Sequence, residues 1–192
     1  MGVTGGLVVH AKTSFLRGIS RVCSTALLSL LASSALADSI TVNAAGTIAS
    51  ACSLSIGSNF AAANLAISGN VSASATVNCN TGFVIKATSA KGAINTSNAN
   101  SHSFVNTLPY QLTLTLPLDT GGSLVGGPCG SATLVSGQTG CALSPGGSGL
   151  SSGGATAVNQ TATLKVAWNS ATTKLVAGSY SNIITLSIAT AQ

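Results

Sequence analysis

Residues 39–52 read SITVNAAGTIASAC, an alternation of polar and apolar residues that ends in a cysteine. Because successive side chains of a strand point to opposite faces, this pattern predicts a β-strand with one apolar face. That apolar face comprises Ile40, Val42, Ala44, Gly46 and Ile48. Two hypotheses follow: the strand fills a groove in another copy of the chain, or it pairs within its own domain.

A leader precedes this stretch. Three basic residues between positions 12 and 21 are followed by a largely apolar run at 22–36 and by a small-residue cleavage site ending at Ala37. This order predicts a signal peptide over residues 1–37, with Asp38 as the first mature residue. A transmembrane helix is the alternative, but the apolar run is shorter than the roughly 20 residues that a span needs.

The mature chain from residue 38 to residue 192 is long enough for one domain with its own core. It carries four lysines against two aspartates and has no glutamate or arginine. This composition forms no basic stripe or aromatic platform, which argues against nucleic-acid binding. Such low charge is unusual for a free soluble monomer. Composition leaves two interpretations open: an assembly buries most of the surface, or the chain is a secreted β protein that tolerates few charges.

Four cysteines remain after the leader: Cys52, Cys79, Cys129 and Cys141. An even number of cysteines behind a signal peptide predicts disulfides in an oxidising compartment. Three pairings are open, and we favour Cys52–Cys79 with Cys129–Cys141, because each pair is nearest in sequence and closes a local unit. A zinc site is the alternative, but neither pair has the usual short spacing and His102 is the only mature histidine.

Alternating patterns recur along the mature chain, whereas no segment shows a helical period over three turns. The predicted strands are 74–79, 83–88, 110–116, 161–168 and 182–189, with a weaker candidate at 131–135. Inward faces are expected at Leu164, Val166 and Trp168 and at Ile184, Leu186 and Ile188. With the N-terminal strand, about seven strands predict an all-β sandwich.

The connections are rich in turn-forming residues. Asn80-Thr81-Gly82 is typical of a hairpin turn, and Pro117 is expected to end the strand before it because proline cannot donate to a ladder. The Gly/Ser/Asn-rich segments expected to be loops are 90–103, 119–130 and 144–154.

The mature chain has few residues that could serve as catalytic acids or bases. Hydrolytic triads need a base and an orienting acid, and glycosidases need paired carboxylates. The chain offers only His102, in a polar loop, with Asp38 at the mature N-terminus and Asp119 in a predicted turn. We therefore expect no enzyme activity, no catalytic residue, no metal and no cofactor.

The order of these parts resembles a known family. An alternating segment runs into Cys52 and is followed by Ser-Leu-Ser-Ile, and a strand ends in VNCNTG at 77–82. A Tyr-Gln-Leu strand begins at Tyr110, and the chain closes with AGSYSNIITLSI at 177–188. Together these motifs resemble the spore coat protein U-like subunits of archaic (Csu-type) chaperone–usher pili, over essentially the whole mature chain.

The resemblance implies an incomplete immunoglobulin-like β-sandwich over residues 52–192 that lacks its final strand, with residues 38–51 as an N-terminal donor strand. A groove beside the first and last strands would be filled first by a periplasmic chaperone and then by the next subunit's donor strand. The last-strand residues at this groove and chaperone edge would be Ile184, Leu186 and Ile188.

In this family an outer-membrane usher and other pilus subunits are further partners, and the product is a surface fibre for adhesion and biofilm formation. Such a subunit passes through the periplasm to a cell-surface pilus. The alternative is a secreted monomeric sugar-binding or surface-binding β-sandwich, in which the N-terminal strand pairs within its own domain.

Overall fold

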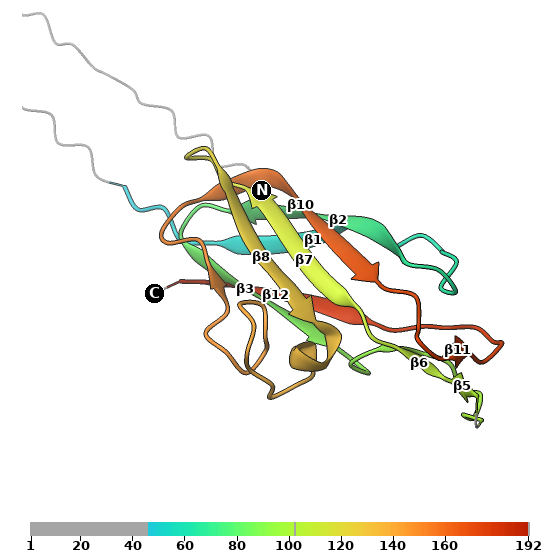
Figure 1. Cartoon of the computed structure of the whole chain (residues 1–192). Coiled ribbons are helices and arrows are strands. Elements are labelled where there is room, and N and C mark those ends of the chain that lie inside the picture. The colour runs from blue at the N-terminus through green and yellow to red at the C-terminus, as the bar shows by residue number, and fades with distance from the viewer. Residues whose placement is uncertain (1–45, 102, 192) are drawn as a thin grey trace, which may run out of the picture. The chain divides into compact units, whose positions relative to one another are not determined.

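The computed structural model describes residues 46–101 and 103–191, and in them strands predominate (Figure 1). The larger sheet has five antiparallel strands in the order β1-β2-β10-β7-β8. They are β1 (Cys52–Ser58), β2 (Gly69–Cys79), β10 (Ala157–Trp168), β7 (Gln111–Pro117) and β8 (Ser123–Gly130). The expected proline boundary at Pro117 is confirmed, because β7 ends there.

A second antiparallel sheet has three strands in the order β12-β3-β9. They are β12 (Ile184–Thr190), β3 (Phe83–Ser89) and β9 (Leu150–Ser151). Two short pairs lie outside these sheets: antiparallel β4 (Ile94–Asn95) with β6 (Thr107–Leu108), and parallel β5 (Phe104–Val105) with β11 (Lys174–Leu175). A single turn of 3₁₀ helix, η1 (Ser131–Leu134), follows β8.

One hydrophobic core receives side chains from both main sheets. In β7 every second residue is buried, which places Leu112, Leu114 and Leu116 inward. The inward face predicted for β10 is confirmed, because Leu164, Val166 and Trp168 are all buried. From the other sheet, β3 contributes alternate buried residues in the same way. The all-β prediction is confirmed, and the two-sheet arrangement is consistent with a β-sandwich.

The hairpin predicted at Asn80-Thr81-Gly82 is wrong. These residues carry the chain from β2 in the larger sheet to β3 in the smaller one. Both edges of β2 are already paired, with β1 and β10, so β3 finds its partners in the other sheet. A turn signal between two strands predicts a change of direction, but it does not decide whether the strands pair.

Three further expectations are corrected. The weak strand at 131–135 is η1, where the buried side chain of Leu134 is reached by a helical turn. The expected loop 119–130 contains β8, which pairs with β7 along most of its length. The expected loops 90–103 and 144–154 contain the short strands β4 and β9.

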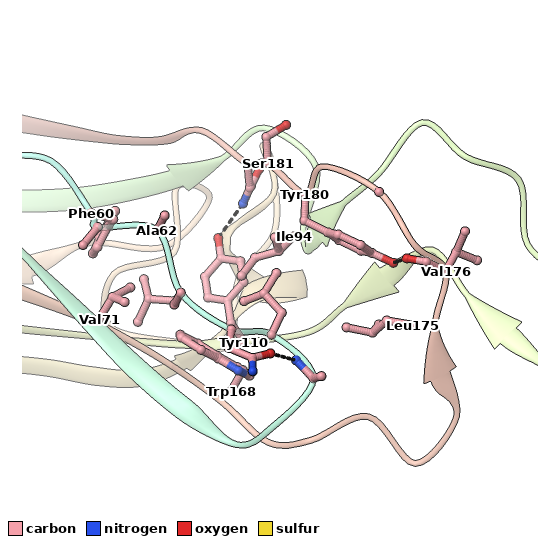
Figure 2. A pocket seen from close by; sticks show the side chains of 18 of the residues that line it. Phe60, Ala62, Val71, Ile94, Tyr110, Trp168, Leu175, Val176, Tyr180 and Ser181 are labelled. Atoms are coloured by element: carbon pink, nitrogen blue, oxygen red, sulfur yellow. Dashed lines mark hydrogen bonds between the residues drawn. The ribbon is translucent and has the colours of Figure 1, made fainter.

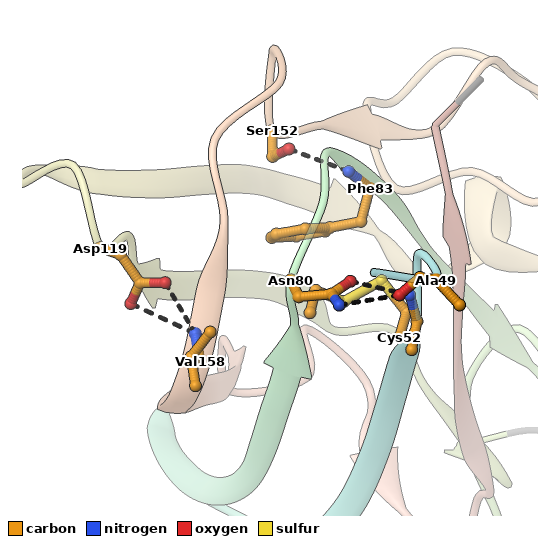
Figure 3. The surroundings of a disulfide bond; sticks show 9 residues. Ala49, Cys52, Asn80, Phe83, Asp119, Ser152 and Val158 are labelled. Carbon is orange, nitrogen blue, oxygen red and sulfur yellow. Dashed lines mark hydrogen bonds between the residues drawn. A yellow bond between two sulfur atoms is a disulfide. The ribbon is translucent and has the colours of Figure 1, made fainter. Parts of the chain in front are cut away.

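Asp119 in the turn between β7 and β8 is held by Thr156 and by the first residues of β10 (Figure 3). Its carboxylate accepts hydrogen bonds from Gln160 Nε2 at 2.8 Å, Thr156 Oγ1 at 2.8 Å and the Val158 amide at 2.9 Å. These donors, the Gln160 amide first, lower the pKa of Asp119, because hydrogen bonds to the charged form favour it. A folded-state pKa below the unfolded value stabilises the fold at neutral pH.

Acid is therefore expected to destabilise the domain through Asp119. The contribution is present above the unfolded pKa of about 4 and is lost as the pH falls through the lowered folded value. Thermal unfolding followed from pH 6 to pH 2 should show a falling melting temperature in this window, and Asp119→Asn should flatten that dependence. An equally steep pH dependence in the variant would contradict this role, because the chain contains only two acidic side chains in all.

Candidate functional site

Two neighbouring strand edges are unpaired in the described part of the chain. β1 pairs only with β2, and β12 pairs only with β3. β1 and β12 approach each other where the two sheets meet. An unpaired edge presents a row of free backbone N–H and C=O groups, to which another strand can add.

The inward side chains of both edges are apolar and incompletely covered. Ile56 of β1 lies opposite the buried Ala75 and therefore shares its core-facing side, yet 79% of Ile56 is exposed. Leu54 on the same face is only partly buried. On β12 the same holds for Ile184, Leu186 and Ile188, which alternate with exposed polar residues and an alanine. We call Leu54, Ile56, Ile184, Leu186 and Ile188 the edge groove.

A cavity of about 710 Å³ lies at one end of this groove (Figure 2). Val71, Val166 and Trp168 line it from the larger sheet, and Ile184 lines it from β12. The segment 60–66 between β1 and β2 closes another side, mainly with alanines and the ring of Phe60. The residues that line it include no charged side chain. An apolar occupant would therefore not have to desolvate a charged group.

Buried hydrogen bonds fix the start of β12 beside this cavity. Tyr110 donates its hydroxyl to Ser89 Oγ at 2.9 Å, and Asn182 Nδ2 donates to both the Tyr110 and the Ser89 oxygen, each at 2.9 Å. Burial raises the pKa of Tyr110, so the hydroxyl stays protonated and remains a donor. The network ties the chain just before β12 to the end of β3.

Two more aromatic residues anchor the cavity walls to backbone carbonyls. Trp168 Nε1 donates to the Ile67 carbonyl at 2.8 Å, which holds the segment 60–66 near β10. The Tyr180 hydroxyl bonds the Val176 carbonyl at 2.9 Å, four residues upstream. Both rings therefore present apolar faces at the cavity while their polar atoms are satisfied elsewhere.

The outer edges of the two sheets differ from β1 and β12. β8 contains Pro128, which has no N–H to donate, and its pairing with β7 is irregular between Leu112 and Leu114. β9 at the edge of the smaller sheet is only two residues long. Among the described strands, the long edges without proline are thus β1 and β12.

The residues predicted for the site are placed as follows. Ile184, Leu186 and Ile188 lie in the edge groove. Gly46 and Ile48 lie in an exposed segment without strand structure, and Ile48 is 91% exposed. The other three residues predicted for the N-terminal strand, Ile40, Val42 and Ala44, lie outside the described residues, as do the signal peptide at 1–37 and His102.

Two disulfides are present, Cys52–Cys79 and Cys129–Cys141, and they are the pairings favoured from the sequence. The first joins the start of β1 to the end of β2, beside the N-terminal segment. Disulfides are typical of proteins exported to an oxidising compartment. Leu54 and Ile56 were not predicted as site residues, although the Ser-Leu-Ser-Ile alternation at 53–56 carries the signal.

None of the helical segments in the described ranges has the length and apolar character of a membrane span. Nor do the side chains described there include a group of three metal-ligating residues. Comparisons with known proteins find no matching family model, no matching curated protein and no matching solved structure.

Proposed function

We propose that this chain is a structural subunit of a chaperone–usher pilus, whose edge groove accepts the N-terminal strand of the next subunit. The observation that carries the proposal is the exposure of core-facing apolar side chains along two neighbouring unpaired edges, with Ile56 at 79%. A self-contained sandwich would cover these side chains with a strand of its own. The resemblance in motif order to archaic pilus subunits supports the same assignment.

The N-terminal segment has the chemistry that the groove requires. Its apolar positions from Ile40 to Ile48 repeat with period two, and residues 39–51 contain no charged side chain. Addition of a strand to an open edge combines backbone hydrogen bonds with pockets for alternate side chains. Burial of four of these apolar side chains gives a gross gain of about 5–8 kcal/mol before ordering costs.

In this proposal the domain has an incomplete immunoglobulin-like fold, with residues 38–51 as the donor segment and 52–192 as the acceptor domain. Residues 49–51 of the donor segment stay bound to their own domain and lead into the part that reaches the neighbour. The hydroxyl of Tyr180, which bonds a carbonyl four residues upstream shortly before β12, is similar to the tyrosine corner of immunoglobulin-like sandwiches. β12 would then be the penultimate strand, and the missing strand would lie along its free edge.

The proposed partners follow from the same mode of assembly. An exposed apolar edge of low charge is prone to aggregation, so a periplasmic chaperone would cover it before assembly. An outer-membrane usher and other pilus subunits complete the set, and the fibre would serve adhesion and biofilm formation at the cell surface.

Deletion of residues 38–49 is the direct test. The mature chain should give a ladder on unheated SDS gels that collapses on boiling, because strand addition is non-covalent and slow to reverse. The deleted chain, co-expressed with the same chaperone, should give no ladder. A monomer band for both chains would mean that the N-terminal strand belongs to its own domain and would overturn the proposal.

Saccharide binding is a second candidate function, favoured by a separate cavity of about 630 Å³. Its polar lining is uncharged and includes Gln111, Asn169, Ser170, Thr172 and Thr173. Such groups suit a neutral, hydroxyl-rich ligand. If the gel test gives only monomers, glycan-array binding that Asn169→Ala weakens would support this function, and an array without binding would exclude it for the glycans tested.

A further inference from the structure

Asn80 connects residues 49–51, the end of the N-terminal segment just before β1, to the end of β2. It makes three hydrogen bonds to them, two of which come from its side chain (Figure 3). Its backbone amide donates to the Ala51 carbonyl at 3.2 Å. Its side-chain Oδ1 accepts from the Ala51 amide at 2.8 Å, and its Nδ2 donates to the Ala49 carbonyl at 2.9 Å. The Cys52–Cys79 disulfide lies next to this contact.

The side chain of Asn80 replaces a backbone partner that the fold removes. β1 and β2 run antiparallel up to the pair Cys52 and Cys79, and a continuing ladder would pair residues 51 and 50 with 80 and 81. Instead the chain leaves β2 after Cys79 and crosses to the other sheet at Phe83. A carboxamide carries both a carbonyl acceptor and an N–H donor, so it can serve the strand segment as a peptide group would.

Asparagine meets this requirement where similar residues do not. The Ala51 N–H needs an acceptor and the Ala49 carbonyl needs a donor. A single short side chain must therefore carry both. Aspartate would set a carboxylate oxygen against the Ala49 carbonyl, and alanine would leave both groups to water. The pattern also decides the orientation of the amide, because the reverse orientation satisfies neither bond.

We propose that Asn80 is a positioning residue that fixes the direction in which the N-terminal segment leaves the domain. This inference rests on the proposed function, in which that segment reaches the neighbouring subunit. Residues 49–51 move with β2, whereas Gly46, Thr47 and Ile48 are exposed and make no backbone hydrogen bond within the described part of the chain. The link between two subunits would therefore bend before residue 49 and not within residues 49–51. In this way Asn80 limits the range of angles between neighbouring subunits.

The test compares Asn80→Ala and Asn80→Asp with the control Asn78→Ala. Asn78 is an exposed residue of the same strand whose side chain makes no hydrogen bond within the described residues. Hydrogen exchange of the Ala51 amide, measured by mass spectrometry on the mature chain, should be about tenfold or more faster in Asn80→Ala, because that amide loses its acceptor. In Asn80→Asp the carboxylate can still accept from the Ala51 amide while it faces the Ala49 carbonyl, so exchange of the Ala51 amide should rise less than in Asn80→Ala. The control should match the unmodified chain.

Electron microscopy of the fibres supplies a second readout that a merely structural role would not move. The distribution of angles between neighbouring subunits should widen in both Asn80 variants, while the heat-labile ladder persists. Unchanged exchange of the Ala51 amide in Asn80→Ala would show that Asn80 does not hold residues 49–51. Faster exchange with unchanged angles would overturn its positioning role. Failure of the unmodified chain to form any fibre would instead count against the proposed function, and exchange alone would then decide whether Asn80 holds the segment.

Discussion

Replacement Ile56→Asp is expected to reduce polymerisation about a hundredfold or more while the subunit still folds. Ile56 is 79% exposed in the structure, so a charge there would stay hydrated until the proposed donor strand is added. Strand addition would then bury an unpaired carboxylate, which costs about 3–5 kcal/mol, and each 1.4 kcal/mol is a tenfold change. The yield of the heat-labile ladder measures the effect, and circular dichroism of the monomer checks the fold.

The matched control is Val125→Asp on β8. Val125 is also an exposed apolar residue, at 56%, but it lies on the opposite edge strand of the same sheet. The same chemical change there should leave the ladder unaltered. Equal losses in both variants would mean that added charge, rather than the edge groove, controls assembly.

Loss of the Cys52–Cys79 disulfide is the second large effect. Replacing both cysteines with alanine should lower the free energy of unfolding by about 3.5 kcal/mol, because the bond closes a loop across a sequence separation of 27 residues. The same bond holds the start of β1 to β2, so the edge that would receive a donor strand should loosen as well. Denaturant titration of the oxidised proteins measures the stability change.

The Cys129–Cys141 pair provides an internal comparison. Its separation is only 12 residues, so the corresponding double replacement should cost less, about 2.8 kcal/mol by the same loop-closure relation. It also lies far along the chain from β1 and should leave assembly intact. If its removal destabilised the protein more than removal of Cys52–Cys79, loop closure would not be the dominant contribution.

Strands with a strict period were predictable from the sequence, and the reason is local. The Leu-Thr-Leu-Thr-Leu run at 112–116 and the alternation at 162–168 each bury one face, and the side-chain pattern records that burial directly. β8 was missed because its stretch Gly-Gly-Pro-Cys-Gly has the composition of a loop. Its strand structure comes from pairing with β7, a tertiary contact that local composition does not encode.

The candidate site was predictable on only one of its sides. Ile184, Leu186 and Ile188 stand out as an alternating apolar set, whereas β1, although it is as long as β12, was not predicted as a strand. That two edges from different sheets come together depends on the crossover after Cys79, which the sequence presents as a simple turn. The three bonds of Asn80 were equally hidden, because they depend on where β2 ends rather than on any motif.

The proline-bearing edge strand β8 has a consequence for the dimensionality of assembly. If the free edges of β8 and β12 could both accept an added strand, each molecule could bind more than one neighbour in this way. Growth would then spread into sheets or branched aggregates. Pro128 and the irregular pairing with β7 remove one of these places. In the proposed assembly each subunit has one edge that receives a strand and one strand to donate, so the fibre would grow as an unbranched line. Its length rather than its width would then respond to the supply of subunits.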